Sequence, residues 1–172
     1  MDGPVFRDAA PADGAAVAAL FNRAFCDTFA HLYQREDLDT FLAGSTAGDW
    51  AAEIAEHGVA VRLAEVGGRA VAFAKMGPLS LPVEGEPGAL ELRSLYVLGP
   101  WHGTGIAREL MDWVLGEART RRAPALYLSV YIDNPRARRF YQRYGFEAVG
   151  RYDFMVGNHA DEDIIMRLAL KT

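Results

Sequence analysis

The sequence predicts an α/β (α+β) fold: a mixed, mostly antiparallel sheet of about six to seven strands flanked by helices, with one parallel strand–helix–strand unit. Three observations support this prediction. Strand-like and helix-like runs alternate along the chain, a Gly-Gly pair at 67–68 separates two strand-like runs, and a helix-periodic run at 103–121 lies between apolar runs at 90–98 and 126–132. Runs joined by tight turns must pair antiparallel, whereas strands joined through a helix can lie parallel.

The first 60 residues are expected to be mainly helical after one short strand. Pro11-Ala12-Asp13 predicts a helix start, with Asp13 near the N-cap, and the apolar periodicity continues to about Cys26. The other elements expected here are a strand at 4–7, helices at 35–42 and 50–56, and a glycine-containing loop between them at 44–48.

The rest of the chain alternates strands and helices. The Gly-Gly pair predicts a hairpin, and the run at 126–132 is apolar enough to be a central strand. Asn134-Pro135 predicts a helix start, and Gly145 its end. The expected elements are strands at 59–66, 70–76, 90–98 and 126–132, helices at 103–121 and 134–144, and two last strands near 148–155 and 163–170.

The composition is that of an ordinary globular chain. Of 172 residues, 51% are hydrophobic and 24% charged, which fits one domain over residues 1–172. The formal charge of −5 argues against broad nucleic-acid binding, which needs a basic surface. No apolar run reaches the ~18 residues of a spanning helix, and the first residues lack the apolar core of a signal peptide. We therefore expect a cytoplasmic protein that binds neither nucleic acid nor membrane, with a homodimer left open.

Metal and disulfide chemistry are not expected. Cys26 is the single cysteine, which excludes an intramolecular disulfide and a cysteine-based zinc site. It lies in an apolar-periodic run, so we interpret it as a buried helix residue rather than a nucleophile. The four histidines show no zinc-binding spacing.

A glycine-containing loop, Trp101-His102-Gly103-Thr104-Gly105-Ile106-Ala107, opens directly into a helix-periodic run. Backbone N–H groups at a helix N-terminus have no internal partner, and glycines let a phosphate approach them, so the loop can hold a diphosphate. A dinucleotide fingerprint would need a third glycine where Arg108 stands, and a P-loop would need Gly-Lys-Ser/Thr. Without further motifs, a plain strand–helix connection explains the loop equally well.

Two motifs together resemble the GNAT superfamily of N-acetyltransferases. The first, Arg/Gln-x-x-Gly-x-Gly/Ala, is matched by His102, Gly105 and Ala107, with histidine in place of the usual Arg or Gln. The second, Asn-x-x-Ala-x-x-x-Tyr-x-x-x-Gly-Phe, is matched by Asn134, Ala137, Tyr141, Gly145 and Phe146. Both motifs occur in the family's order and at its spacing.

The resemblance implies an acetyl-CoA site. The pantetheine arm would bond main-chain groups of Leu95, Tyr96 and Val97, between two splayed parallel strands. The diphosphate would lie on residues 102–107, namely His102, Gly103, Thr104, Gly105, Ile106 and Ala107. Asn134 would contact CoA, although its position before Pro135 is equally explained by an N-cap. One of the basic residues Arg136, Arg138 and Arg139 could reach the 3′-phosphate; solvated helix charges are the alternative.

The resemblance also implies two catalytic groups. Tyr141 would be the general acid that protonates the leaving thiolate, because a phenol stays protonated at neutral pH; a core aromatic is the alternative. Glu91 would be the base that removes the proton of the attacking amine. A same-face pair of Glu91 with Arg93 is the structural alternative, and Glu84 and Glu86 are further candidates for the base.

The acceptor is less defined. The stretches 25–29, 39–42, 152–157 and 163–166 look like PaiA-type spermidine/spermine N-acetyltransferases, which implies direct transfer from acetyl-CoA to a primary amine, with a polyamine as a candidate. Acidic residues Asp27, Asp37 and Asp39 could attract such a cation, or could be ordinary helix-surface charge. Acetylation of a protein N-terminus or an aminoglycoside, and a CoA-binding module without catalysis, remain alternatives.

Overall fold

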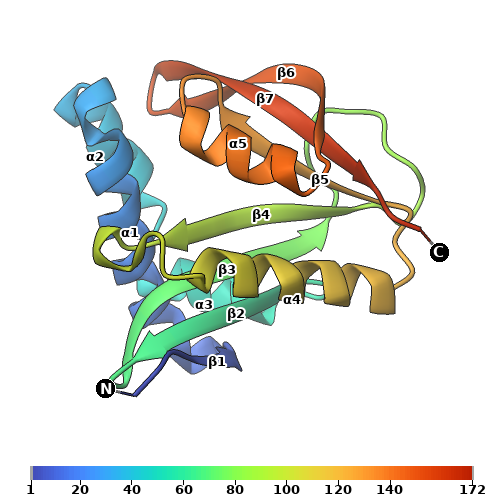
Figure 1. Ribbon diagram of the computed structural model, residues 1–172. Coiled ribbons are helices and arrows are strands. Elements are labelled where there is room, and N and C mark those ends of the chain that lie inside the picture. Colours follow the sequence, from blue (N-terminus) through green and yellow to red (C-terminus); the bar gives the residue numbers. More distant parts are fainter. Residues whose placement is uncertain (1, 172) are drawn as a thin grey trace.

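A seven-stranded sheet in the order β1-β2-β3-β4-β5-β7-β6 forms the centre of the computed structural model, which describes residues 2–171 (Figure 1). The strands are β1 Val5–Asp8, β2 Ala60–Val66, β3 Arg69–Pro78, β4 Leu90–Val97, β5 Ala125–Tyr131, β6 Glu147–Val156 and β7 His159–Ala169. The α-helices are α1 Gly14–Phe29, α2 Arg35–Ala43, α3 Ala47–Ala55, α4 Ile106–Thr120 and α5 Pro135–Arg143, with 3-10 turns at Pro11–Asp13, Ala30–Leu32 and Gly99–Trp101.

The predicted mixed sheet is confirmed. β4 and β5 form its parallel pair, and the other neighbours within the described chain pair antiparallel. The predicted Gly-Gly hairpin joins β2 and β3, and both Gly67 (φ 58°) and Gly68 (φ 77°) have the left-handed backbone that such a turn requires.

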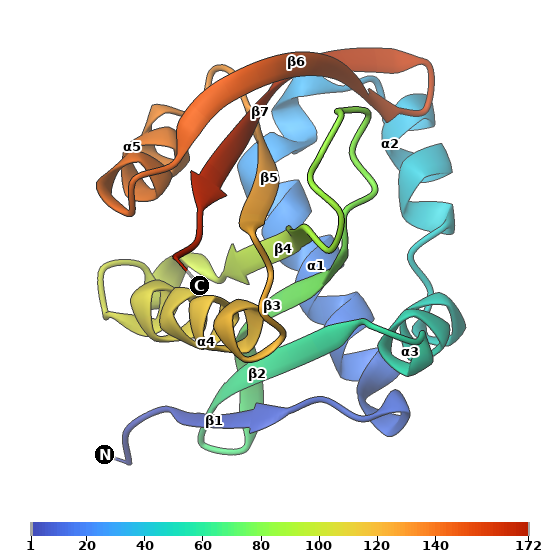
Figure 2. The same cartoon turned by 90° about the vertical axis from the view of Figure 1, so that its right-hand side faces the viewer.

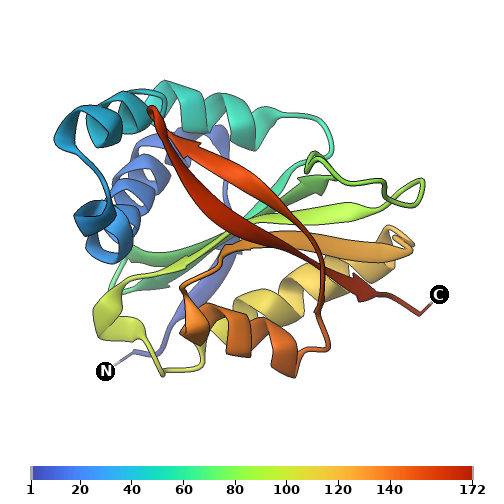
Figure 3. The ribbon, with the colours of Figure 1, turned by 90° about the horizontal axis from the view of Figure 1, so that it is seen from above.

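Helices cover both faces of the sheet (Figure 3). Helices α1, α2 and α3 lie on one face, where Phe21, Phe25 and Trp50 pack on Phe73 of β3. Helices α4 and α5 lie on the other face, where α4 buries Leu110 and other apolar residues against the sheet. Because strand side chains alternate between faces, β2 and β3 contribute to both cores.

Several predicted boundaries differ from the structure, for example the end of α1 at Phe29 and the start of β7 at His159, and two differences have a clear local reason. The helix expected from residue 103 begins at Ile106, because Gly103 and Gly105 both have positive φ and cannot join the helix. The loop expected at 44–48 is shorter, because Thr46 caps α3: its side chain accepts from the Asp49 N–H, and the Asp49 carboxylate accepts from the Thr46 N–H. Asp13 precedes α1, but its side chain bonds the Ala10 N–H and Arg7 instead of capping that helix.

The parallel strands separate almost at once. β4 and β5 pair only at Leu90↔Leu126 and Glu91↔Tyr127, and then diverge (Figure 2). A bulge contributes to this separation, because the register between β3 and β4 shifts after Lys75↔Ser94, so that Arg93 has no partner in β3. The C-terminal part of β4 is thus open on the side of β5.

Candidate active site

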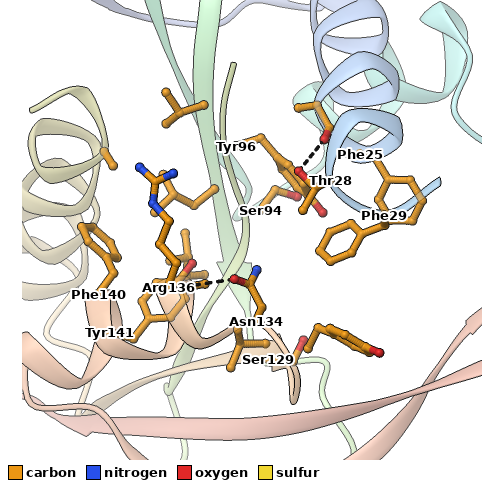
Figure 4. A pocket seen from close by; sticks show the side chains of 18 of the residues that line it. Phe25, Thr28, Phe29, Ser94, Tyr96, Ser129, Asn134, Arg136, Phe140 and Tyr141 are labelled. Atoms are coloured by element: carbon orange, nitrogen blue, oxygen red, sulfur yellow. Dashed lines mark hydrogen bonds between the residues drawn. The ribbon is translucent and has the colours of Figure 1, made fainter. Parts of the chain in front are cut away.

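A cavity of about 720 Å³ lies where β4 and β5 diverge. Residues Leu92–Val97 of β4 form one wall, and the glycine loop, α1, α5, β5 and β7 complete it. Figure 4 shows Phe25, Thr28 and Phe29 of α1 on one side of β4 and Phe140 and Tyr141 of α5 on the other. The cavity therefore passes through the sheet and is lined from both faces.

The glycine loop borders this cavity. At Gly103 and Gly105 an added Cβ would meet no atom within 4 Å, and both residues line the cavity, so a ligand can approach the backbone closely. The N-terminus of α4 follows directly, with N–H groups that no side chain caps. These features fit a diphosphate.

Most of the residues predicted to hold the cofactor meet here. Those that line the cavity are Leu95, Tyr96, Val97, His102, Gly103, Gly105, Ala107 and Asn134. Thr104 and Ile106 do not line it. The Thr104 hydroxyl donates to the Trp101 carbonyl at 2.5 Å and fixes the loop, whereas the Ile106 side chain is buried in the core beneath α4.

His102 connects the loop to α5. Arg136 Nη1 lies 2.7 Å from His102 Nδ1, and His102 Nε2 lies 2.7 Å from the Val97 carbonyl oxygen. Arginine can only donate, so Nδ1 accepts and the Nε2–H donates to Val97; both ring nitrogens are thereby used. The histidine that replaces the usual Arg or Gln thus places a guanidinium beside the glycine loop.

The basic residues of α5 have different roles. Arg136 lines the cavity, as do Arg143 of the same helix and Arg108 of α4. The sequence analysis did not predict Arg108 or Arg143 as part of the CoA site. Arg138 instead donates to the Ile132 carbonyl at 3.0 Å, and Arg139 is exposed. The cavity is therefore cationic where the loop borders it.

Asn134 is an N-cap and also reaches the cavity. Its Oδ1 accepts from the Ala137 N–H at 3.3 Å, which confirms the capping interpretation (Figure 4). The side-chain NH₂ remains available, so the predicted CoA contact stays compatible with the cap.

Tyr141 projects from α5 to the cavity wall with its ring packed edge-on against Phe140 and Phe146. Burial alone raises the pKa of its phenol, and no hydrogen bond within residues 2–171 contributes to that shift. The hydroxyl is thus protonated at neutral pH and has its proton free for a group in the cavity.

Glu91 lies at the closed end of the gap, and the cavity lining begins one residue later. Its Oε1 accepts from the Ser80 N–H and hydroxyl, both at 2.9 Å, and from the Leu81 N–H at 3.1 Å. Arg93 donates to the Pro78 carbonyl at 2.7 Å, so the Glu91–Arg93 pair considered above does not form. Glu91 holds the loop before β4, and its role as a base stays a prediction.

The two other candidate bases lie in that loop. Glu86 accepts from its own backbone N–H, from Tyr127 and from Arg167, which lowers its pKa to about 2. A carboxylate so stabilised is a poor proton acceptor at neutral pH. Glu84 is exposed and outside the cavity lining.

Two acids that the sequence analysis did not single out line the cavity: Asp161 and Asp163 of β7, which are 5% and 7% exposed. Burial, and then the charge of Asp161, raise the pKa of Asp163 to about 7, against a smaller opposing effect of the Ser129 hydroxyl. The signal in the sequence is the alternation of acids at the start of an apolar strand. Asp27, Asp37 and Asp39 lie outside the cavity lining, and Asp27 and Asp39 pair with Arg23 and Arg35 on their own helices.

Residues 2–171 contain no group of three or more His, Cys, Asp or Glu side chains placed to bind a metal ion, and no helix long and apolar enough to cross a membrane. Cys26 is only half-buried, less than predicted, and burial raises the pKa of its thiol. It does not line the cavity.

A glycine loop before a helix, beside a gap between two parallel strands, is the arrangement that the resemblance to the GNAT superfamily implies. Residues 16–146 match the family model described as Acetyltransferase (GNAT) family. The chain therefore belongs to the GNAT family of acetyltransferases, which confirms the resemblance inferred from the two motifs.

Individual relatives agree with this assignment. An uncharacterized N-acetyltransferase of Mycobacterium tuberculosis is 36% identical over 107 residues, a match that covers 62% of this chain and 65% of the relative. The crystal structure of a PaiA N-acetyltransferase from Thermoplasma acidophilum in complex with coenzyme A superposes with a TM-score of 0.79 at 16% identity, over 98% of this chain and all of the other. A ribosomal-protein-alanine N-acetyltransferase from Brucella melitensis has a TM-score of 0.71 at 27% identity, over 96% and 99% of the two chains.

Proposed function

We propose that this protein is an N-acetyltransferase that moves an acetyl group from acetyl-CoA to a primary amine by direct attack. The observation that carries this proposal is the cavity that begins where β4 and β5 separate, with the glycine loop and α5 on one face of the sheet and α1 on the other. Such a passage lets two substrates enter from opposite faces and meet. Family membership supports the same reading.

The residues present fit a CoA molecule. The diphosphate would be held by backbone N–H groups of residues 102–107, with Arg136 as the nearby cation. The pantetheine arm would bond main-chain groups of residues 95–97, on the side of β4 that no strand covers. Asn134 would contribute its free amide NH₂. When bound, acetyl-CoA supplies a thioester whose carbonyl carbon an amine can attack.

Tyr141 is the proposed general acid. The reaction breaks the C–S bond and leaves a thiolate that takes up a proton, and the Tyr141 hydroxyl holds such a proton at the cavity wall without an internal partner. A non-catalytic CoA-binding module would need no free acid at this place.

The acceptor is proposed to be a small aliphatic amine, with polyamines as the first candidates. Two buried carboxylates line the cavity, and the solved structure of a PaiA N-acetyltransferase shares the fold. The likeness to a ribosomal-protein-alanine N-acetyltransferase keeps a protein N-terminus as the second candidate.

A steady-state thiol-release assay tests the proposal. Acetyl-CoA is held at a saturating level while polyamines, aminoglycosides and short peptides with free N-termini are supplied in turn. Amine-dependent thiol release with a monoacetylated product by mass spectrometry is the expected result. Tight CoA binding by calorimetry without release on any amine would instead identify a binding module.

A further inference from the structure

One end of the cavity contains a carboxylate without a cationic partner. Asp161 and Asp163 are two residues apart on β7, so both side chains project from the same face of the sheet. Both carboxylate oxygens of Asp161 have a partner: Tyr33 donates to Oδ2, and His159 Nε2 lies 3.2 Å from Oδ1. Within residues 2–171, no arginine, lysine or histidine forms an ion pair with Asp163.

The surroundings of Asp163 are aromatic. Tyr131 of β5 and Tyr152 of β6 are its cross-strand neighbours, and the ring of Phe29 packs edge-on to that of Tyr131 at 6.0 Å. Phe29, Tyr33 and Tyr131 line the same cavity. Removing a carboxylate from water is costly unless a cation or strong donors compensate it, so this arrangement suits a cationic ligand placed between the carboxylate and the aromatic faces.

Asp163 lines the same cavity as the proposed acid, Tyr141. Tyr96 of β4 lines it as well, with its ring packed against Phe21 and Phe73. The proposed CoA site and the carboxylate therefore belong to one continuous cavity.

We propose that Asp163 binds the ammonium group of the acceptor and takes its proton, so that the substrates are protonated aliphatic amines. This inference rests on the proposed acetyltransferase function and specifies its acceptor site. It assigns the proton acceptor to β7, in place of Glu91, whose carboxylate is already held by Ser80 and Leu81.

The proton balance is complete with the groups present. The ammonium gives one proton to the Asp163 carboxylate, and its freed lone pair forms the C–N bond with the acetyl carbon. The C–S bond breaks with its electron pair on sulfur, and sulfur takes a proton from Tyr141. The nitrogen then loses a second proton, which returns to Tyr141, while Asp163 releases its proton to solvent. The net products are the amide, the free thiol and one proton.

Several titratable groups lie around Asp163 and Asp161. They are Asp161 on the same strand, Tyr131 on β5, Tyr152 on β6, Tyr96 on β4, and Tyr33 and His159 around Asp161; the Ser129 hydroxyl lies 3.1 Å from that of Tyr152. Because burial and Asp161 raise the pKa of Asp163 to about 7, this carboxylate can exchange a proton near neutral pH, which suits a general base.

The kinetic test uses 1,4-diaminobutane as the acceptor, with Asp163→Asn compared with the wild type over pH 5.5–9. The wild-type kcat/KM should break near pH 7, where Asp163 ionises. In Asp163→Asn it should fall by at least ~10²-fold at pH 7.5, lose the break, and climb steadily with pH as free amine becomes available. Asp153→Asn, on the exposed face of the same hairpin, is the matched control.

A stability measurement supplies a readout independent of turnover. The folded pKa of Asp163 lies above that of the unfolded chain, so the contribution of Asp163 to wild-type stability decreases as pH rises from about 4 through 7. Asp163→Asn removes the free-energy cost of ionising this buried carboxyl group. Its midpoint of thermal unfolding should exceed that of the wild type at pH 8, and the difference should shrink toward pH 4.

The outcomes separate the two proposals. No thiol release by the wild type on any amine would refute the acetyltransferase function. Release by the wild type, with the break near pH 7 kept in Asp163→Asn and lost in Glu91→Gln, would refute only the role of Asp163. Equal unfolding midpoints of wild type and Asp163→Asn at pH 8 would show that the carboxylate is not held at a cost, and would also overturn the inference.

Discussion

Arg136 donates to Nδ1 of His102 at 2.7 Å, and this contact joins the start of α5 to the loop before α4. The family pattern has Arg or Gln where His102 stands, so here the cation comes from another helix. Nδ1 of the imidazole acts as the acceptor that holds the guanidinium in place, while Nε2 donates to the Val97 carbonyl.

Replacing this cation should weaken CoA binding. Arg136→Gln is expected to raise the Kd for CoA about 10- to 100-fold, because a charge-assisted hydrogen bond contributes roughly 1.5–3 kcal/mol. Arg139→Gln, an exposed change on the same helix, is the control. Calorimetry with both CoA and 3′-dephospho-CoA shows which phosphate Arg136 contacts. An equal loss of affinity for both ligands indicates the diphosphate. A loss of affinity for CoA alone would assign Arg136 to the 3′-phosphate.

Gly105 is expected to be required for CoA binding. Its φ of 88° strains any L residue, and an added side chain would project into open cavity space rather than into protein. Gly105→Val should therefore abolish measurable CoA binding, while the circular dichroism stays close to that of the wild type and the backbone strain of about 1–2 kcal/mol lowers the unfolding midpoint by only a few degrees. Gly99→Val, at an open position with ordinary φ, is the control. Undiminished affinity in Gly105→Val would exclude the loop as the diphosphate site.

The phenol of Tyr141 can be tested without disturbing its ring. Tyr141→Phe keeps the packing against Phe140 and Phe146 and removes only the hydroxyl. The rate constant should fall by ~10²-fold or more, with CoA affinity little changed. Single-turnover kinetics beside calorimetry separates the two effects, and wild-type rates in the variant would leave Tyr141 a packing role alone.

Cys26 should be dispensable. The thiol is half-buried, its pKa is raised by burial, and it lies outside the cavity, so it has none of the features of an acyl-carrying nucleophile. Cys26→Ala should retain most of the activity, and initial-rate patterns should be sequential. Ping-pong patterns, or an acetyl group on Cys26 found by mass spectrometry, would contradict direct transfer.

Local patterns predicted the fold well because its elements depend on nearby residues. The Gly-Gly turn, the Asn134 cap and the apolar strand β5 are all read from a few neighbouring positions. The sequence analysis identified the glycine loop and Tyr141 as site residues because the two family motifs fall within one continuous stretch of the chain.

Contacts between distant segments could not be predicted in this way. The approach of Arg136 to His102 spans 34 positions and depends on how α5 packs beside the loop. The burial of Asp163 depends on its register with Tyr131 and Tyr152, which no local pattern defines. Likewise, Glu91 has the strand position expected of a base, but the loop that folds back onto it supplies three donors.

The two residue pairs that join β4 to β5 have a consequence for hydrogen exchange. Amides in the middle of a sheet are usually the slowest to exchange, because neighbouring strands bond them on both sides. Beyond Glu91, β4 has such a neighbour only in β3, so the amides of residues 92–97 that point toward β5 should exchange quickly in the free protein. With CoA bound they should become slow. β4 is the middle strand of the sheet, but on the side of β5 it behaves as an edge strand whose hydrogen bonds a ligand would complete.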